Sequence, residues 1–101
     1  MKLSSKQRSF LRKKGNKMEA IVRVGKDGVT DNLIKSLNDL LIAREFVKVK
    51  ILENSEEDKR VIAEELTKKT ESELVHILGR TLQIFRENPN KPIISDELKE
   101  I

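Results

Sequence analysis

Apolar residues change their spacing along this chain from a helical period to an alternating one, which constrains the fold more than any other feature. Between residues 33 and 41 they follow the i, i+1, i+4, i+7, i+8 pattern of a helix buried along one side, carried by Leu33, Ile34, Leu37, Leu40 and Leu41. The segment 46–51 then alternates with period two; one face carries Val47, Val49 and Ile51, and the other carries Phe46, Lys48 and Lys50. This order indicates a domain in which helices pack on a sheet.

Two local signals bound the first predicted helix. Ser4 and Gln7 have the S-x-x-Q spacing of a capping box, so the helix should begin at Ser4. Gly15 and Asn16 form a pair that readily adopts the left-handed cap conformation, so the helix should end there. Its buried stripe is expected to consist of Leu3, Phe10 and Leu11.

Two further helices are predicted from capping residues. Thr30 should cap the second helix, which carries the apolar stripe of residues 33–41. Ser55 should cap a third helix through about Lys69, whose acidic start suits the helix dipole. The inward-facing side chains of the third helix are expected to be Val61, Ile62 and Leu66.

The remaining apolar segments predict a mixed sheet. A short run at residues 21–24 precedes the second helix, and runs at 74–78 and 81–85 are joined through Gly79-Arg80 with the spacing of a tight hairpin. The predicted fold is a single compact α/β domain of order αβαβαββ, with a four-stranded mixed sheet and three helices. The breaker cluster at residues 87–92 predicts a domain over 1–87 and a C-terminal tail over 88–101.

The composition argues against several classes of protein. The 101 residues contain no cysteine, which removes disulfide frameworks and thiolate metal sites, and the apolar runs fall far short of the roughly 20 residues that span a bilayer. The only histidine, His76, has no second histidine or cysteine with which to activate a nucleophile, and no nucleotide-binding signature is present. We expect a cytoplasmic monomer that is not an enzyme, with no cofactor, metal, small-molecule substrate or membrane partner.

Positive charge is concentrated in the first third of the chain. Residues 1–30 contain nine Lys and Arg against two Asp and Glu, whereas the other 71 residues contain twelve against fifteen. A localised positive field of this kind attracts nucleic acid or another anionic surface. The candidate contacts are Arg8, Arg12, Lys13, Lys14, Lys17 and Arg23, with Lys48, Lys50, Arg80 and Arg86 as a second group.

Two glycines bracket a cationic turn between the first strand and the second helix, in the sequence Gly25-Lys26-Asp27-Gly28. Loops of the GxxG type clamp the sugar-phosphate backbone of RNA, because a side chain at the glycine positions would hold the strand away. Lys26 would contact a phosphate, and Asp27 would face solvent or a 2′-hydroxyl. The same four residues also suit a structural turn that needs a positive φ, so both interpretations stay open.

Four motifs then carry a family resemblance. They are Lys6-Gln7-Arg8-x-Phe10-Leu11-Arg12, Val24-Gly25-Lys26-x-Gly28, Glu45-Phe46-Val47-Lys48-Val49-Lys50 and Gly79-Arg80-Thr81-Leu82. In this order they resemble the CRM-domain RNA-binding family, specifically its stand-alone bacterial YhbY type, over residues 3–87. The chain departs from the family where members commonly carry Ala-His in place of Gly15-Asn16 and Tyr in place of Phe85.

The resemblance implies a fold similar to the C-terminal domain of translation initiation factor three, and binding to ribosomal RNA in pre-50S precursors of the large subunit. The loop and the basic helix are expected to form one RNA-facing surface centred on the loop. Three phenylalanines are the only aromatic residues, and Phe10 is expected in the core, so recognition of backbone and shape is favoured over base readout. The charge leaves one alternative open, an adaptor whose basic patch meets an acidic protein.

Overall fold

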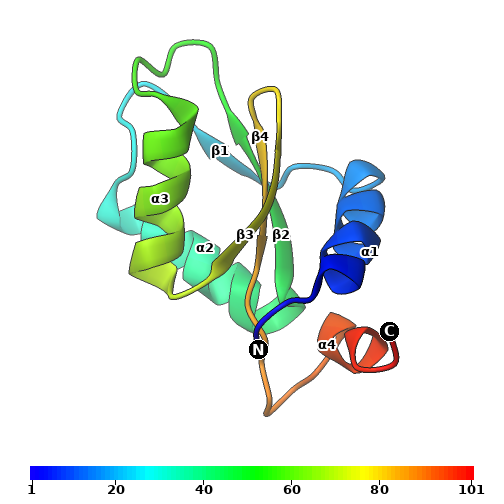
Figure 1. The fold of residues 1–101 in the computed structure, drawn as a ribbon. Coiled ribbons are helices and arrows are strands. Elements are labelled where there is room, and N and C mark those ends of the chain that lie inside the picture. Colours follow the sequence, from blue (N-terminus) through cyan, green and yellow to red (C-terminus); the bar gives the residue numbers. More distant parts are fainter.

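A four-stranded mixed sheet separates two layers of helices in the computed structural model, which describes all 101 residues (Figure 1). The elements follow in the order α1 (Ser5–Asn16), β1 (Val22–Val24), α2 (Asp31–Arg44), β2 (Phe46–Ile51), α3 (Lys59–Thr70), β3 (Glu73–Leu78), β4 (Thr81–Phe85) and α4 (Ile94–Leu98). The predicted α/β class and the order of the first seven elements are confirmed. The short helix α4 is a fourth helix that the sequence did not predict.

The strands lie in the order β1-β2-β4-β3, so the last strand of the chain is inserted between two earlier ones. β1 pairs with β2 in parallel, and β4 is antiparallel to both β2 and β3. The predicted hairpin between β3 and β4 is confirmed, and Gly79 in its turn has a φ of +59°. A β-bulge between Leu74 and His76 interrupts the register of this hairpin.

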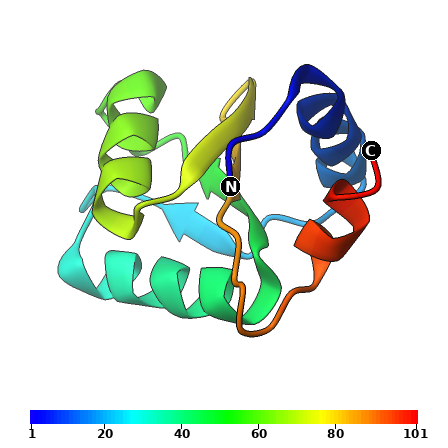
Figure 2. The same ribbon diagram turned by 60° about the horizontal axis from the view of Figure 1, so that its bottom comes forward.

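Each face of the sheet has its own apolar cluster. Side chains of α2 and α3 pack with those of β1, β2 and β4 around Leu37, Ile62 and Leu82. On the other face α1 and α4 cover Phe46 and Phe85, which are partners in the sheet and are each 1% exposed. Figure 2 shows the two helical layers on either side of the sheet. The sequence had assigned Phe46 to the polar face, but α1 and α4 bury that end of the strand.

The N-cap residue was predicted correctly for two helices and wrongly for a third. Ser4 and Gln7 form the expected capping box, and the Thr30 hydroxyl accepts a hydrogen bond from the Leu33 amide at 3.1 Å. The third helix is capped by Asp58 rather than Ser55, through a 2.7 Å bond from the Arg60 amide. Ile62 and Leu66 are buried as predicted, whereas Val61 lies about 100° around the helix from Ile62 and is 49% exposed.

Gly15 allows α1 to pack closely against β4 and does not form a left-handed helix cap. The helix continues through Asn16, and the C-cap residue Lys17 has a right-handed φ of −94°. A Cβ atom on Gly15 would lie 2.4 Å from Cδ of Gln83, a buried side chain whose amide donates to the Asn16 side chain and, at 3.4 Å, to the Arg12 carbonyl. The glycine therefore sets how closely α1 approaches β4.

We expect Gly15→Ala to lower the free energy of unfolding by about 1–2 kcal/mol, because overpacking outweighs the higher helix propensity of alanine. In a Gln83→Ala background the same substitution should stabilise the protein instead, since the clash is gone and the propensity gain remains. Denaturant unfolding of the four proteins in this cycle measures both values. An equal cost in both backgrounds would contradict the packing explanation.

The segment after β4 is fastened by one buried carboxylate. Glu45, at the junction of α2 and β2, is 0% exposed and has a φ of +64°. Its Oε1 accepts the amides of Ile93 and Ser95 at 2.7 and 2.9 Å, and its Oε2 accepts the Asn88 amide and the Ser95 hydroxyl, both at 2.7 Å. These bonds hold residues 88–95 in place, and Leu98 of α4 then enters the cluster around Phe46 and Phe85.

Candidate nucleic-acid interface

The outer face of α1 carries a stripe of three lysines and one aromatic ring. Lys6, Phe10, Lys13 and Lys17 are spaced four, three and four residues apart, which places them along one side of the helix. All three lysines are exposed, as is Arg12, while Phe10 is half-buried. Lys6 was not among the predicted contacts, although its helical spacing from Lys13 places it on the same side of α1.

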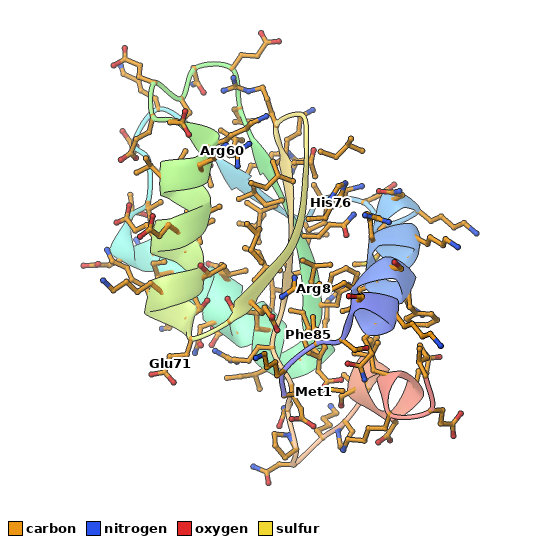
Figure 3. The ribbon with its side chains drawn as sticks, viewed as in Figure 1. Met1, Arg8, Arg60, Glu71, His76 and Phe85 are labelled. Carbon is orange, nitrogen blue, oxygen red and sulfur yellow. The ribbon has the colours of Figure 1, made fainter.

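Two side chains of α1 that were predicted to contact RNA, Arg8 and Lys14, also form bonds within the protein. The Arg8 guanidinium reaches from α1 toward the sheet, donating to the Leu74 carbonyl at 3.0 Å and pairing with the Glu73 carboxylate (Figure 3). Lys14 lies 3.4 Å from the Glu97 carboxylate in an exposed ion pair. Arg8 therefore ties α1 to the edge strand β3, and Arg12, Lys13 and Lys17 are the predicted α1 cations that are exposed with no ion pair to a carboxylate.

A basic strip crosses the sheet on the side where α1 lies. Arg23 of β1 and Lys50 of β2 are partners in the parallel register, and both are exposed. Lys48 lies two residues along β2 on the same face, half-buried, with its ammonium donating to the Met18 carbonyl at 3.1 Å. The helices cover the Phe46 end of this face and leave the Lys50 end open.

The glycine loop is a tight turn at the end of β1. The Gly28 amide donates to the Gly25 carbonyl at 3.0 Å, and Gly28 has a φ of +68°, which a glycine adopts without strain. Gly25 has no positive φ, and a Cβ atom placed on it would meet Asn54 and Leu52 at 3.6 Å, an ordinary contact distance. The fold therefore explains Gly28 but not Gly25.

The surroundings of the loop are less cationic than the sequence predicted. Lys26 and Asp27 are both exposed, and a Cβ on Gly28 would lie 3.7 Å from the Glu57 carboxylate in the acidic connection before α3. The N-terminus of α2 is also partly occupied, since Thr30 accepts the Leu33 amide and Asp31 stands in the first turn. Lys26 is therefore the main positive charge at the loop itself.

The structure does not bring the loop and the basic helix next to each other. Figures 1 and 2 both show the connection from β1 to α2 on one flank of the molecule and α1 on the other. The strip of Arg23, Lys50 and Lys48 lies between them on the sheet. Gln83 of β4, the register partner of Lys48 on β2, donates a hydrogen bond to Asn16 at the end of α1. Lys48 and Lys50, which the sequence placed in a second group of contacts, therefore lie nearer the centre of the candidate interface than predicted.

The two arginines of the second group hold the fold together. Arg80 donates to the carbonyls of Ile51 and Leu52 at 3.1 and 2.6 Å, where β2 ends. Arg86 donates to the Asn38 side chain and to the Thr70 carbonyl at 2.6 and 2.7 Å, which joins the middle of α2 to the C-terminal end of α3. We therefore place neither guanidinium in the candidate interface.

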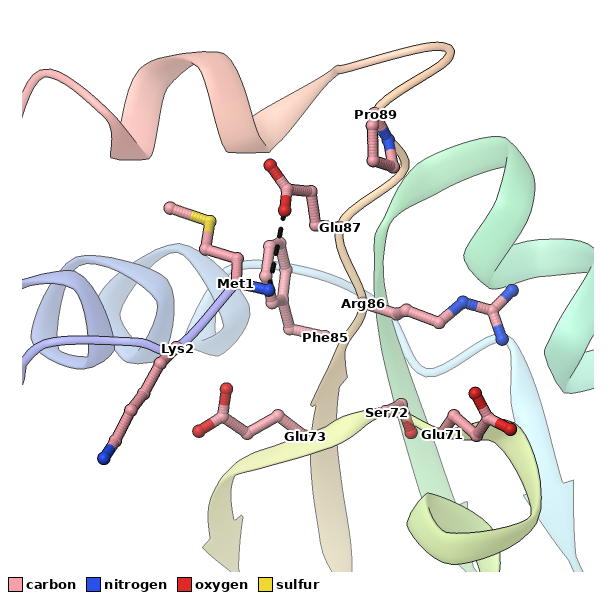
Figure 4. A pocket seen from close by; sticks show the side chains of 9 residues that line it. All are labelled: Met1, Lys2, Glu71, Ser72, Glu73, Phe85, Arg86, Glu87 and Pro89. Atoms are coloured by element: carbon pink, nitrogen blue, oxygen red, sulfur yellow. Dashed lines mark ion pairs between the residues drawn. The ribbon is translucent and has the colours of Figure 1, made fainter.

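A hollow beside the N-terminus has the wrong charge for a polyanion. Figure 4 shows Glu71, Glu73 and Glu87 in its lining, together with Lys2 and Arg86. The N-terminal ammonium lies 3.5 Å from the Glu87 carboxylate, so part of its positive charge is already paired. This hollow therefore lies outside the candidate interface.

No group of three or more His, Cys, Asp or Glu side chains is placed to hold a metal ion. His76 lies half-buried on β3, with Gln83 of β4 as its partner. None of the helices combines the length and the apolar character that crossing a bilayer requires.

Comparisons with known proteins agree with one another. The family model of the CRS1/YhbY (CRM) domain matches residues 3–86. The chain is 46% identical over 92 residues to the probable RNA-binding protein YqeI of Bacillus subtilis, which covers 90% of this chain and 96% of that protein. It is 33% identical over 108 residues to the probable RNA-binding protein MJ0652 of Methanocaldococcus jannaschii, with 95% and 80% covered.

A solved structure supports the fold directly. The solution structure of the protein SAV1595 from Staphylococcus aureus matches with a TM-score of 0.75 at 40% sequence identity, over 89% of this chain and 95% of that chain. The curated relatives carry the names of RNA-binding proteins and not of enzymes.

Proposed function

The chain belongs to the CRS1/YhbY (CRM) domain family, and from this membership we propose that it is an RNA-binding protein. The RNA lies along three adjoining features: the outer face of α1, the strip of Arg23, Lys48 and Lys50, and the glycine loop. The names of the relatives support RNA as the ligand, and the distribution of exposed cations supports the proposed course of the RNA over the surface. Neither points to catalysis.

The exposed cations suit a phosphate backbone because each can neutralise a phosphate and release a counterion. Arg12, Lys13 and Lys17 extend from α1, and Arg23 with Lys50 continues the positive surface over the sheet. A surface of this kind recognises structured RNA through its backbone and shape.

The contrast between the two loop glycines is the observation that carries the proposed role of the loop. Gly28 is required by its positive φ, whereas nothing in the fold requires a glycine at position 25. A glycine without a structural reason at the end of a strand suits the close approach of another backbone. Lys26, exposed and adjacent, is placed to contact a phosphate of that backbone.

Two substitutions test the loop. We expect Gly25→Ala to unfold with the stability of the wild type but to bind a stem-loop RNA roughly tenfold more weakly, the loss expected when about one good contact is removed. Lys26→Glu should weaken binding and lower the log–log salt slope by more than the roughly 0.7–0.9 expected for one neutralised phosphate. Fluorescence anisotropy at several salt concentrations measures both.

The matched control is Lys35→Glu, which makes the same charge change at an exposed position of α2. It should leave the salt slope nearly unchanged. Unaltered affinity in both loop variants, each shown to be folded, would remove the loop from the interface. Failure of the wild type to bind RNA at low salt, combined with binding to an acidic protein, would favour the adaptor function.

We further propose that the RNA is ribosomal and that the protein acts on pre-50S particles during assembly of the large subunit. This step is supported by the resemblance of the four sequence motifs to stand-alone bacterial members of the family. Crosslinking in cells, followed by sequencing of the attached RNA, should show enrichment of ribosomal RNA. A profile without that enrichment would reject this step and leave RNA binding itself intact.

A further inference from the structure

Phe10 is the one aromatic side chain of this protein that is not buried. The chain has three phenylalanines and no tyrosine or tryptophan, and Phe46 and Phe85 are each 1% exposed in the core. Phe10 packs only partly against the cluster around those two residues, and the rest of its surface faces outward from α1. An aromatic ring is therefore available at the centre of the basic stripe.

The ring lies between two shallow surface hollows that contain no acidic side chain. One is lined by Ser5, Lys6, Ser9, Phe10, Lys13 and Ile101. The other is lined by Phe10, Lys13, Lys14, Lys17 and Met18. Phe10 and Lys13 are common to both, so the ring is flanked by lysines along the helix and by apolar or hydroxyl groups between them.

We propose that Phe10 is a stacking platform for an unpaired base of the bound RNA, with the phosphates on either side of that base contacting Lys13 and Lys17. This inference rests on the proposed RNA-binding function and adds a single-stranded element to the ligand. Unpaired bases stack on exposed aromatic rings, whereas bases in a helical duplex have no free face to offer. Backbone contacts alone would not need a ring among the lysines.

A lysine ammonium lies over the ring of Phe10. Nζ of Lys14 lies 5.9 Å from the centroid of the Phe10 ring, and the same ammonium is 3.4 Å from the Glu97 carboxylate. Cation–π contacts and ion pairs at exposed positions are both weak, so a ligand displaces this ammonium readily. Once displaced, the ammonium is free to meet a phosphate.

The competing explanation is that Phe10 only fills space beside α4. A leucine would serve that purpose nearly as well, because it keeps an apolar side chain against the same cluster while it removes the aromatic face. Phe10→Leu therefore separates packing from stacking. We expect this variant to bind an RNA hairpin with an unpaired loop about 5- to 150-fold more weakly than the wild type, the range that corresponds to the loss of one stacking residue.

The comparison ligand is a fully paired RNA duplex with the same number of phosphates. Phe10→Leu should bind this duplex as the wild type does, because the lysines remain. Equal affinity of the variant and the wild type for the hairpin would overturn the stacking proposal. Weak binding of both RNAs by the wild type would instead refute the proposed function, so the two failures are distinguishable.

A fluorescent variant provides a direct readout. Since the chain has no tryptophan, Phe10→Trp introduces the only indole, and stacking of a base on it should quench its emission when the hairpin is added and not when the duplex is added. Val61→Trp, at a position 49% exposed on α3, is the matched reporter and should respond to neither RNA. Hairpin binding without quenching in Phe10→Trp would overturn the proposal.

Discussion

We expect Glu45→Gln to lower the free energy of unfolding by about 2–4 kcal/mol, a large effect for an isosteric change. The carboxylate accepts four hydrogen bonds from Asn88, Ile93 and Ser95, and all are lost or weakened when one oxygen becomes an amide nitrogen. The amide nitrogen is a donor and faces donors, so either the Asn88 amide loses its acceptor or the Ile93 and Ser95 amides both do. Denaturant unfolding monitored by circular dichroism measures the change.

Glu97→Gln is the matched control because it changes another carboxylate of the same C-terminal segment. Glu97 is exposed and makes only the ion pair with Lys14, so its substitution should alter stability by less than about 0.5 kcal/mol. Similar stabilities for Glu45→Gln and Glu97→Gln would contradict the role assigned to the buried carboxylate.

The Glu45 carboxylate also makes the free energy of unfolding depend on pH in the acidic range. Burial acts to raise the pKa of Glu45, but the hydrogen bonds from Asn88, Ser95 and Ile93 outweigh it and hold the pKa below its ordinary value of 4.5. The contribution of Glu45 is therefore complete above about pH 4.5 and is lost as pH falls through the lowered pKa. The stability gap between wild type and Glu45→Gln should be constant from neutral pH to about pH 5 and should narrow below it.

Reversing three charges on α1 should have the largest effect on binding. We expect Lys13→Glu, Lys14→Glu and Lys17→Glu together to weaken RNA binding by at least about a thousandfold at low salt, and to lower the log–log salt slope by roughly 2–3. All three side chains are exposed, and their only ion pair is the weak one between Lys14 and Glu97, so the fold should tolerate the change. Salt-dependent anisotropy measures affinity and slope together.

The control carries the same change in net charge on the opposite layer, as Lys35→Glu, Arg60→Glu and Lys68→Glu. These positions are exposed on α2 and α3. If binding depends on where the cations lie, the control should lose far less affinity than the α1 variant. Equal losses would show that net charge, and not the face formed by α1, controls association.

Local signals in the sequence predicted most of the helices and strands correctly. The capping residues Ser4 and Thr30 form hydrogen bonds within their own first turns, so nearby residues alone decide those helix starts. Ser55 and Asp58 are both good capping residues, and the sequence could not choose between them. The buried face of the helix carries Ala63 and Thr70 as well as Ile62 and Leu66.

Long-range contacts account for what the sequence did not predict. Gly15 meets Gln83, and Glu45 binds amides 43 to 50 residues further along the chain. Helix α4 depends on that carboxylate, since its N-cap residue, Ile93, has no side chain that can accept a hydrogen bond, and Glu45 accepts the Ile93 and Ser95 amides instead. Such partners have no periodic pattern that a single sequence would reveal.

Part of the candidate interface could be predicted from the sequence. The cations of α1 were predicted from the concentration of positive charge in residues 1–30, and a positive φ at one loop glycine was among the open interpretations. The split between α1 and the loop, and the central place of Arg23 and Lys50, depend on strand register. Phe10 was assigned to the core because its spacing matches Leu3 and Leu11, and only its partial exposure distinguishes it.

The position of β4 between β2 and β3 has a consequence for the newly synthesised chain. The strands β2 and β3 cannot pair with each other directly, and α1 rests on Gln83 and Phe85 of β4. The sheet and the orientation of the basic helix are therefore completed only after residue 85 has left the ribosome, although the cations of α1 are made before every strand of the sheet. The order of synthesis thus keeps the proposed RNA surface unassembled until β4 has emerged.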